Sequence, residues 1–303
     1  MTKHKIYRSP LFYVGDKFKL VAELKQYFPE KIEKFVEPFA GGGSVFLNID
    51  AKEFLLNDID TSVFQLHNFL IHQSKNPKIF FQKIEKIILE YNLSHSYIKD
   101  VVPDDLKQQW KKTYYAKYNK ASFQKLKSDF NSSKKKDLYK LYVLLIFGFN
   151  RMLRFNSKGE YNLPVGNVDF NQNVLKALND FFNIISTKNI QWNNTDYKKH
   201  IENIDLKKND FVYLDPPYLI TFSEYNKFWN EEKEKELVAT LDNLNKKNIR
   251  FAVSNVTHYK GQENKIFSKW ASKYRVKEVK SNYISYHDNT VKTFKEVLVT
   301  NYQ

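Results

Sequence analysis

The chain has 303 residues, a formal net charge of +15 at pH 7 and a hydrophobic fraction of 42%. That hydrophobic fraction is typical of a folded protein and excludes disorder, whereas the positive charge indicates a polyanionic partner or membrane head groups. Because there is no cysteine, disulfides, zinc-thiolate sites, thiol nucleophiles and the zinc-dependent base deaminases are excluded. The first residues lack the apolar stretch of a signal peptide, and the longest apolar run, residues 141–149, is too short to span a bilayer. We therefore expect a cytoplasmic protein with no membrane partner and no metal site.

The first predicted elements alternate between strand and helix over residues 33–75. Two apolar runs are typical of strands, and a glycine turn with a short helix separates them. In chain order these are the strand Lys34–Glu37, the turn Ala40–Gly43, the helix Ser44–Ile49 and the strand Glu53–Asp58.

The glycine turn indicates a ligand that approaches the main chain. A phosphate loop is disfavoured because Gly43 is followed by Ser44 rather than lysine. A dinucleotide-binding motif is disfavoured because Phe46 occupies the position of its third glycine. An adenosine without a pyrophosphate fits better. Asp58, at the end of the next strand, is placed to accept hydrogen bonds from ribose hydroxyls, although an aspartate there can equally cap a helix.

The middle of the chain, residues 76–205, has a different composition. Between residues 106 and 136 there are ten lysines, six aromatic residues and a single acidic residue, Asp129. Such a run is either a solvated helix face or a surface that faces phosphates, and the interleaved aromatic residues favour the second. A buried helix is predicted over Leu138–Phe149, and a long loop or hairpin over Asn156–Asn167.

The strand and helix pattern resumes over residues 210–257, with a strand at Phe211–Leu214, a helix over 231–247 and a strand at Ile249–Val253. Strands separated by helices of this length predict a parallel sheet. The runs Tyr274–Val279 and Thr293–Val299 alternate as expected for an antiparallel pair at the sheet edge.

The tetrapeptide Asp215-Pro216-Pro217-Tyr218 directly follows a predicted strand. It places a carboxylate, a prolyl carbonyl and an aromatic face within four residues, a set that suits a flat group bearing an NH2, such as a nucleobase. The alternative is a strand that simply ends in a Pro-Pro turn. The aspartate before the prolines and the tyrosine after them favour the binding site.

Together these segments resemble the Dam-type, α-class DNA adenine-N6 methyltransferases, which use S-adenosylmethionine. Phe35–Phe46 is similar to the family's methyl-donor motif and Asp215–Tyr218 to its catalytic motif, in that order along the chain. Pro10–Lys17, Phe251–Asn255 and Glu296–Asn301 also have counterparts in the family. The resemblance implies an α/β fold, with a Rossmann-like methyltransferase sheet that has helices on both faces and an inserted, mainly helical target-recognition domain. We expect residues 1–75 and 206–303 to form the catalytic domain and residues 76–205 the inserted domain.

The resemblance also implies roles for single residues. Catalysis falls to Asp215, Pro216, Pro217 and Tyr218. Binding of S-adenosylmethionine falls to Tyr13, Lys17, Phe39, Ala40, Gly41, Asp58 and Asp215. Contact with double-stranded DNA falls to Phe149, Asn150, Arg154, Asn156 and Pro164.

Two of the positions that resemble the recognition motif depart from it. Phe149 occupies a position where the family motif has a tyrosine, and Arg151 one where it has a glycine. Arg154 falls where GATC-specific members of the family use an arginine to contact a guanine. This favours GATC as the target sequence, with another short palindrome as the alternative. The alternative for Arg154 is a phosphate contact or a salt bridge.

We therefore predict a site-specific methyltransferase that flips adenine out of the duplex and transfers a methyl group to its N6. Asp215 and the Pro216 carbonyl would each accept one amino hydrogen, so that the nitrogen lone pair localises toward the sulfonium methyl. A restriction endonuclease with the same target is a potential counterpart. The alternatives are an RNA or protein-glutamine N-methyltransferase, and an inactive DNA-binding relative.

Overall fold

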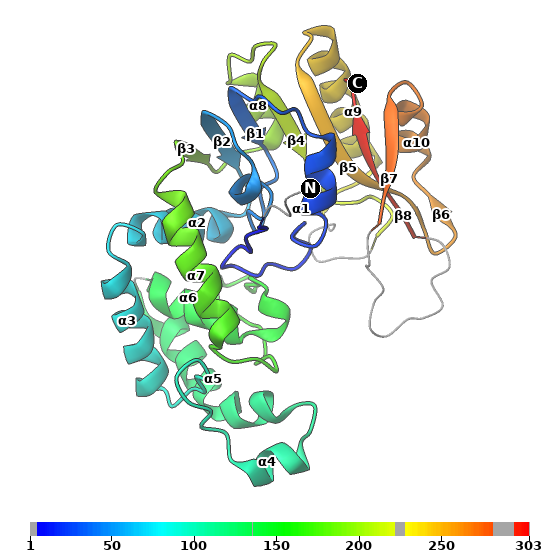
Figure 1. The fold of residues 1–303 in the computed structure, drawn as a ribbon. Coiled ribbons are helices and arrows are strands. Elements are labelled where there is room, and N and C mark those ends of the chain that lie inside the picture. Colours follow the sequence, from blue (N-terminus) through cyan, green and yellow to red (C-terminus); the bar gives the residue numbers. More distant parts are fainter. Residues whose placement is uncertain (1–4, 135, 222–227, 281–293, 303) are drawn as a thin grey trace. The chain divides into compact units, whose positions relative to one another are not determined.

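The computed structural model describes residues 5–134, 136–221, 228–280 and 294–302, and it divides the chain into two compact units (Figure 1). The sheet unit comprises residues 17–40, 48–59 and 188–303, and the helical unit comprises residues 1–16, 41–47 and 60–187. Each unit is therefore assembled from segments that lie far apart in the sequence.

The sheet unit is a mixed sheet in the order β3-β2-β1-β4-β5-β8-β7, with the short β6 paired to β5. The first five strands of that order are parallel, β8 runs antiparallel to β5, and β7 runs antiparallel to β8. This is a Rossmann-like arrangement with a reversed pair at one end. The strands are β1 (Lys34–Glu37), β2 (Glu53–Asn57), β3 (Ile190–Asn193), β4 (Phe211–Leu214), β5 (Arg250–Tyr259), β6 (Gln262–Glu263), β7 (Arg275–Val279) and β8 (Phe294–Thr300).

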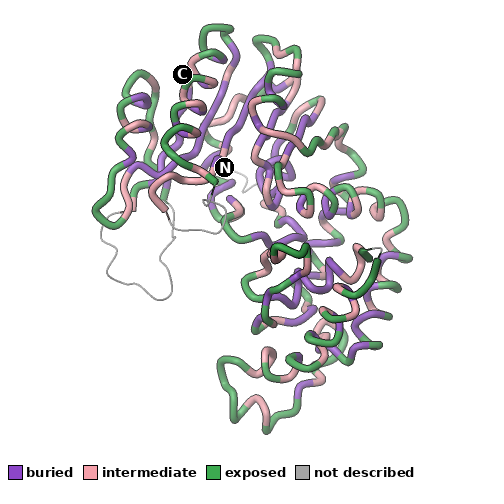
Figure 2. Tube along the Cα trace, turned by 180° about the vertical axis from the view of Figure 1, so that it is seen from behind, coloured by how far each residue is buried: buried purple, intermediate pink, exposed green. Residues whose placement is uncertain are grey.

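Apolar side chains cover both faces of this sheet, which explains why the central strands are continuous hydrophobic runs. On one face, Val212 and Leu214 join a buried core with the apolar sides of α8, α9 and α10. On the other face, the ring of Phe28 packs 4.9 Å from Phe211 and 5.2 Å from Tyr213. Figure 2 shows the buried trace following the strands. The helices of this unit are α1 (Val21–Leu24), η1 (Lys25–Tyr27), α8 (Tyr197–Glu202), α9 (Glu231–Lys246) and α10 (Lys265–Ala271).

The helical unit is organised around α6, in which every residue from Leu141 to Phe147 is buried. Helices α2, α3 and α5 pack against it. Side chains of Asp60, Asp137 and Asn171 accept backbone N–H groups at the starts of α2, α6 and α7, and so define where these helices begin. The helices are α2 (Thr61–Gln73), α3 (Pro77–Glu90), α4 (Asp104–Gln109), α5 (Tyr114–Ser132), α6 (Leu138–Phe147), η3 (Phe149–Arg151) and α7 (Gln172–Ile185); the short η2 covers Phe46–Asn48.

Most predicted elements are confirmed, including the parallel sheet, the buried helix at residue 138 and the helix at residue 231. One predicted element is wrong. The helix predicted over Ser44–Ile49 is a single 3-10 turn, η2. The two C-terminal strands form the predicted antiparallel pair at one end of the sheet, with β7 outermost and β8 next to it; Thr293 lies outside the described residues. Residues 190–202, expected in the inserted segment, form β3 and α8 of the sheet unit.

Within the described part of the chain, every helix is too short or too polar to cross a membrane.

Candidate active site and DNA-binding residues

Asp215 directly follows β4, at the carboxyl end of a central parallel strand. Its Oδ2 lies 2.6 Å from the ammonium of Lys17, and its Oδ1 accepts a hydrogen bond of 2.8 Å from the Tyr218 hydroxyl. The Lys17 side chain is 4% exposed and that of Asp215 is 17% exposed. Burial of a charge is costly unless it is paired, so the two side chains hold each other in place.

Glu296, on β8, completes this group of charges, and the sequence did not single out its side chain. Its Oε1 lies 3.6 Å from the Lys17 ammonium and 3.0 Å from the Tyr218 hydroxyl, and the side chain is fully buried. One ammonium therefore faces two carboxylates. We call Lys17, Asp215, Tyr218 and Glu296 the Asp215 cluster.

The Tyr218 hydroxyl stays protonated in this setting. Burial, and then the charges of Asp215 and Glu296, raise the pKa of Tyr218 well above 10. The single hydroxyl hydrogen can be donated to one of the two carboxylates at a time. The Lys17 ammonium also lies 5.2 Å from the centre of the Tyr218 ring, which fixes the orientation of the ring.

Three aromatic rings cluster near the same edge of the sheet. Phe39, in the loop after β1, lies 4.8 Å from the ring of Tyr197 and 5.9 Å from that of Trp229. Trp229 in turn donates its indole N–H to the buried carboxylate of Glu234 at 2.6 Å. Of these residues only Phe39 was predicted from the sequence.

Asn57, the last residue of β2, ties together the loops that follow three neighbouring strands. Its side-chain amide donates to the carbonyls of Pro38 and Thr195, each at 3.0 Å, and its Oδ1 accepts from the Thr195 amide. Asp58 follows it and is half-buried. The helix cap that was the alternative role for Asp58 is taken by Asp60.

These groups of the sheet unit fit an adenosine-containing methyl donor. An aromatic face, a carboxylate for hydroxyl groups and a charged cluster lie on loops at the carboxyl edge, where open α/β sheets bind their ligands. Phe39, Ala40 and Asp58 come from the first two of these loops, and Lys17 and Asp215 belong to the charged cluster.

The glycine turn belongs to the helical unit and has a strict geometry. Gly41 and Gly43 adopt φ values of +48° and +76°, which favour glycine. A Cβ at Gly42 would lie 2.7 Å from the Cβ of Tyr13, so the turn and Tyr13 are packed directly together.

His67 supports this turn from α2. It is fully buried and its Nε2 donates to the carbonyl of Gly41 at 2.8 Å. Burial lowers the pKa of His67 to about 4, so the ring is neutral at pH 7 and the Nε2–H tautomer makes the bond.

The predicted DNA-contacting residues lie on a projecting turn and hairpin of the helical unit. Phe149 is 48% exposed and Asn150 is exposed. The turn is anchored where the Phe149 amide donates to the carbonyl of Pro164 at 2.9 Å and the Gly166 amide to that of Phe147 at 2.7 Å.

Arg154 and Asn156 lie on the same hairpin. The guanidinium of Arg154 donates from Nε to the Asn162 side chain at 2.8 Å and from Nη2 to the Asn162 carbonyl at 3.4 Å. Asn156 uses its amide within the hairpin, donating to Glu160 and accepting from the amides of Lys158 and Glu160. In this structure Asn156 therefore shapes the turn.

The lysine-rich segment forms α4 and α5, and its aromatic residues divide between core and surface. Phe123 and Phe130 are buried, so these two are core residues and not part of a surface for bases. Trp110 is 37% exposed, with the ammonium of Lys117 3.8 Å from its ring centre. The lysines at 117, 120 and 125 are exposed.

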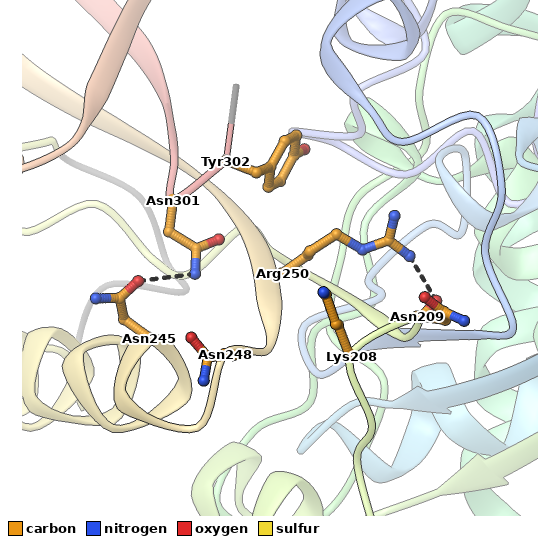
Figure 3. A pocket seen from close by; sticks show the side chains of 7 residues that line it. All are labelled: Lys208, Asn209, Asn245, Asn248, Arg250, Asn301 and Tyr302. Carbon is orange, nitrogen blue, oxygen red and sulfur yellow. Dashed lines mark hydrogen bonds between the residues drawn. The ribbon is translucent and has the colours of Figure 1, made fainter.

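A polar pocket of about 330 Å³ lies at the opposite, amino-terminal edge of β4 and β5 (Figure 3). Arg250 donates there to the backbone carbonyls of Asn209 and Lys31, so its guanidinium braces the strand entries. The position is the wrong edge for the predicted chemistry. Among the described residues there is no group of acidic or histidine side chains suited to a metal ion.

Comparison with known proteins agrees with the motifs. Residues 13–284 match the model of the D12 class N6 adenine-specific DNA methyltransferase family. The chain is 35% identical to the type II methyltransferase M.FokI of Planomicrobium okeanokoites and 33% identical to the modification methylase StsI of Streptococcus sanguinis, over 99% of this chain but 44% and 43% of those proteins. It is 29% identical to a DNA adenine methylase of Haemophilus influenzae, over 74% of this chain and 68% of that protein.

The chain thus spans less than half the length of the first two relatives. The family match covers both the glycine turn and the Asp215 cluster except for Glu296. The chain belongs to the D12 class N6 adenine-specific DNA methyltransferase family.

Proposed function

We propose that this chain transfers a methyl group from S-adenosylmethionine to N6 of an adenine in a short duplex DNA sequence. The observation that carries the proposal is the Asp-Pro-Pro-Tyr segment at the end of β4, with the Asp215 carboxylate fixed by Lys17 and Tyr218. The family match and the net charge of +15 support the same function.

Asp215 acts as a hydrogen-bond acceptor for the amino group of the adenine. Its two oxygens offer about four lone-pair positions, so Lys17 and Tyr218 leave room for one amino hydrogen. The Pro216 carbonyl accepts the other hydrogen. The amino nitrogen then becomes pyramidal, and its lone pair points toward the methyl group that bound S-adenosylmethionine supplies. Catalysis by this chain is mainly alignment and electrostatics.

The neighbours of Asp215 fix its orientation. The Lys17 ammonium holds Oδ2, and the protonated Tyr218 holds Oδ1. Glu296 holds Lys17 and Tyr218 from the far side, and so acts as a positioning residue. No proton has to leave the amine before transfer, because it becomes acidic only once the methyl group is attached.

The target base must leave the duplex to reach such a site, at a cost of a few kcal/mol. We propose that Tyr218 stacks on the flipped adenine, and that Phe149 and Asn150 enter the space it vacates. Arg154 reads a guanine edge through two parallel hydrogen bonds. We take GATC as the first target to test.

The test is transfer of a labelled methyl group to duplexes that carry GATC or each of its single-base-pair variants. Asp215→Ala should lower the rate by about 10²–10³ or more while DNA affinity persists. A duplex with purine in place of the target adenine, which lacks the amino group, should accept no label. Transfer to tRNA or to protein in preference to duplex DNA would redirect the proposal, and binding without any transfer would indicate an inactive relative.

A restriction endonuclease that cuts the same sequence is a proposed counterpart. If it exists, DNA methylated by this chain should resist that nuclease, and unmethylated DNA should be cut. Cleavage of both would argue against a shared target.

A further inference from the structure

Two arginines meet on one phenylalanine in the helical unit. The guanidinium carbons of Arg8 and Arg151 lie 4.5 Å and 4.1 Å from the centre of the Phe12 ring. Phe12 itself is 4% exposed, so its ring is a fixed platform. We call Arg8 and Arg151, stacked on Phe12, the pair.

The backbone at this place is strained. Phe12 and Arg151 have φ values of +50° and +51°, and Asn150, next to Arg151, has +54°. A non-glycine residue in this region costs on the order of 1 kcal/mol or more. A glycine at position 151 would hold the same turn without that cost, so the turn alone does not account for an arginine there.

The charge of Arg151 is incompletely balanced within the described residues. Its Nε is buried without a hydrogen-bond partner, and no carboxylate of the described chain forms an ion pair with it. Burial, and then the charge of Arg8, lower the pKa of Arg151 to about 10 against the opposite effects of Tyr142 and Asp169, so the Arg151 guanidinium remains positive at pH 7. Two neighbouring cations on one apolar ring repel each other, and an anion bound between them would relieve both the repulsion and the desolvation.

We propose that Arg8 and Arg151 together bind one backbone phosphate of the duplex, beside the turn that carries Phe149 and Asn150. This deepens the proposed function and rests on it. A tetrahedral anion suits two converging guanidinium groups better than the neutral edge of a base does. A phosphate held there would fix the register of the DNA at the point where Phe149 is exposed, without reading any base.

The experiment measures DNA binding by the full chain, in a salt series, with Arg8→Ala, Arg151→Gly and the double variant. Glycine at 151 keeps the positive φ, and Arg8 is exposed, so the variants are expected to fold; thermal melting checks this. Loss of one phosphate contact lowers the slope of log K against log[salt] by about 0.9. We expect the double variant to lower it by about that amount, not twice as much, because the two arginines share one phosphate.

A second arm uses duplexes in which single phosphates are replaced by uncharged methylphosphonates. For the unaltered chain, one methylphosphonate near the target should lower the affinity for DNA. The same methylphosphonate should leave the affinity of Arg151→Gly and of Arg8→Ala unchanged, because these variants have already lost the phosphate contact. Arg275→Ala, on the exposed edge strand β7, is the matched control and should keep both the slope and that sensitivity.

The proposal is overturned if every methylphosphonate lowers the affinity of the variants as much as that of the unaltered chain. It is also overturned if the affinity lost in the variants depends on the identity of one base pair. DNA binding is measured independently of methyl transfer, so the phosphate contact and the proposed function can each be refuted without the other. A chain that binds through the pair but transfers no methyl group would refute only the function, and active enzyme with an unchanged phosphate profile would refute only the pair.

Discussion

At the level of single residues, the buried ammonium of Lys17 is predicted to contribute strongly to stability. Lys17→Met would remove the ammonium that faces the carboxylates of both Asp215 and Glu296. Breaking a buried pair in this way costs about 3–5 kcal/mol, so we expect the free energy of unfolding in urea at pH 7 to fall by that order. Methyl transfer should fall with it, because Asp215 loses the partner that turns it.

The matched control for Lys17 is Lys52, whose ammonium lies 2.8 Å from Glu33 with both side chains well exposed. Lys52→Met should change stability by no more than about 1 kcal/mol, because solvent screens an exposed pair. Equal losses in the two variants would contradict the role given to burial.

The Tyr218 hydroxyl and the Tyr218 ring have separable roles. Tyr218→Phe keeps the ring but removes the donor to Asp215 and Glu296, and a buried acceptor left unpaired costs about 1–3 kcal/mol. We expect kcat for methyl transfer to fall with little change in the KM for DNA. Tyr213→Phe, which removes a buried hydroxyl bonded to Ser254, should lose stability and keep its activity. A raised KM in Tyr218→Phe would assign the hydroxyl to substrate binding instead.

At the level of elements, the contact between α2 and the glycine turn is predicted to be sensitive to pH. The pKa of His67 is lowered to about 4 in the folded chain and is near 6.5 when unfolded. Its contribution is therefore fully present above pH 6.5 and is lost as the pH falls toward 4, because the unfolded chain takes up the proton first. The loss is of the order of 3 kcal/mol.

Urea unfolding between pH 7 and 4 measures this effect. His67→Gln, whose side-chain amide can reach the Gly41 carbonyl, should flatten the pH dependence, whereas His72→Gln on the exposed side of α2 should not. If the His67→Gln profile matches that of the unaltered chain, another group is responsible.

The elements also show what the sequence could and could not predict. The apolar runs of β1, β4 and β5 predicted the parallel sheet because both faces of these strands are buried. In contrast, β3 alternates between half-buried and exposed residues and falls within the segment 76–205 that was expected to be the insert, so nothing local distinguished it. The position of Asp215 followed from its motif, whereas the hydrogen bond between Tyr218 and Glu296 joins residues 78 positions apart and needed the tertiary structure. A lone glutamate among the apolar residues of β8 was the one available signal.

At the level of the whole molecule, a net charge of +15 predicts DNA binding that weakens steeply with salt, on specific and non-specific duplexes alike. Substitution of the exposed lysines of α5 tests whether DNA is bound by this surface in particular or attracted by the positive charge of the whole chain. Replacing Lys117, Lys120 and Lys125 with glutamine should lower the slope of log K against log[salt] by up to about three if each faces a phosphate. The same number of changes at Lys246, Lys247 and Lys269, which are exposed on the sheet unit, removes the same charge and should change the slope much less. Equal slopes in the two triple variants would mean that the charge acts only as a diffuse field, whereas a difference would assign α5 to the DNA-binding surface.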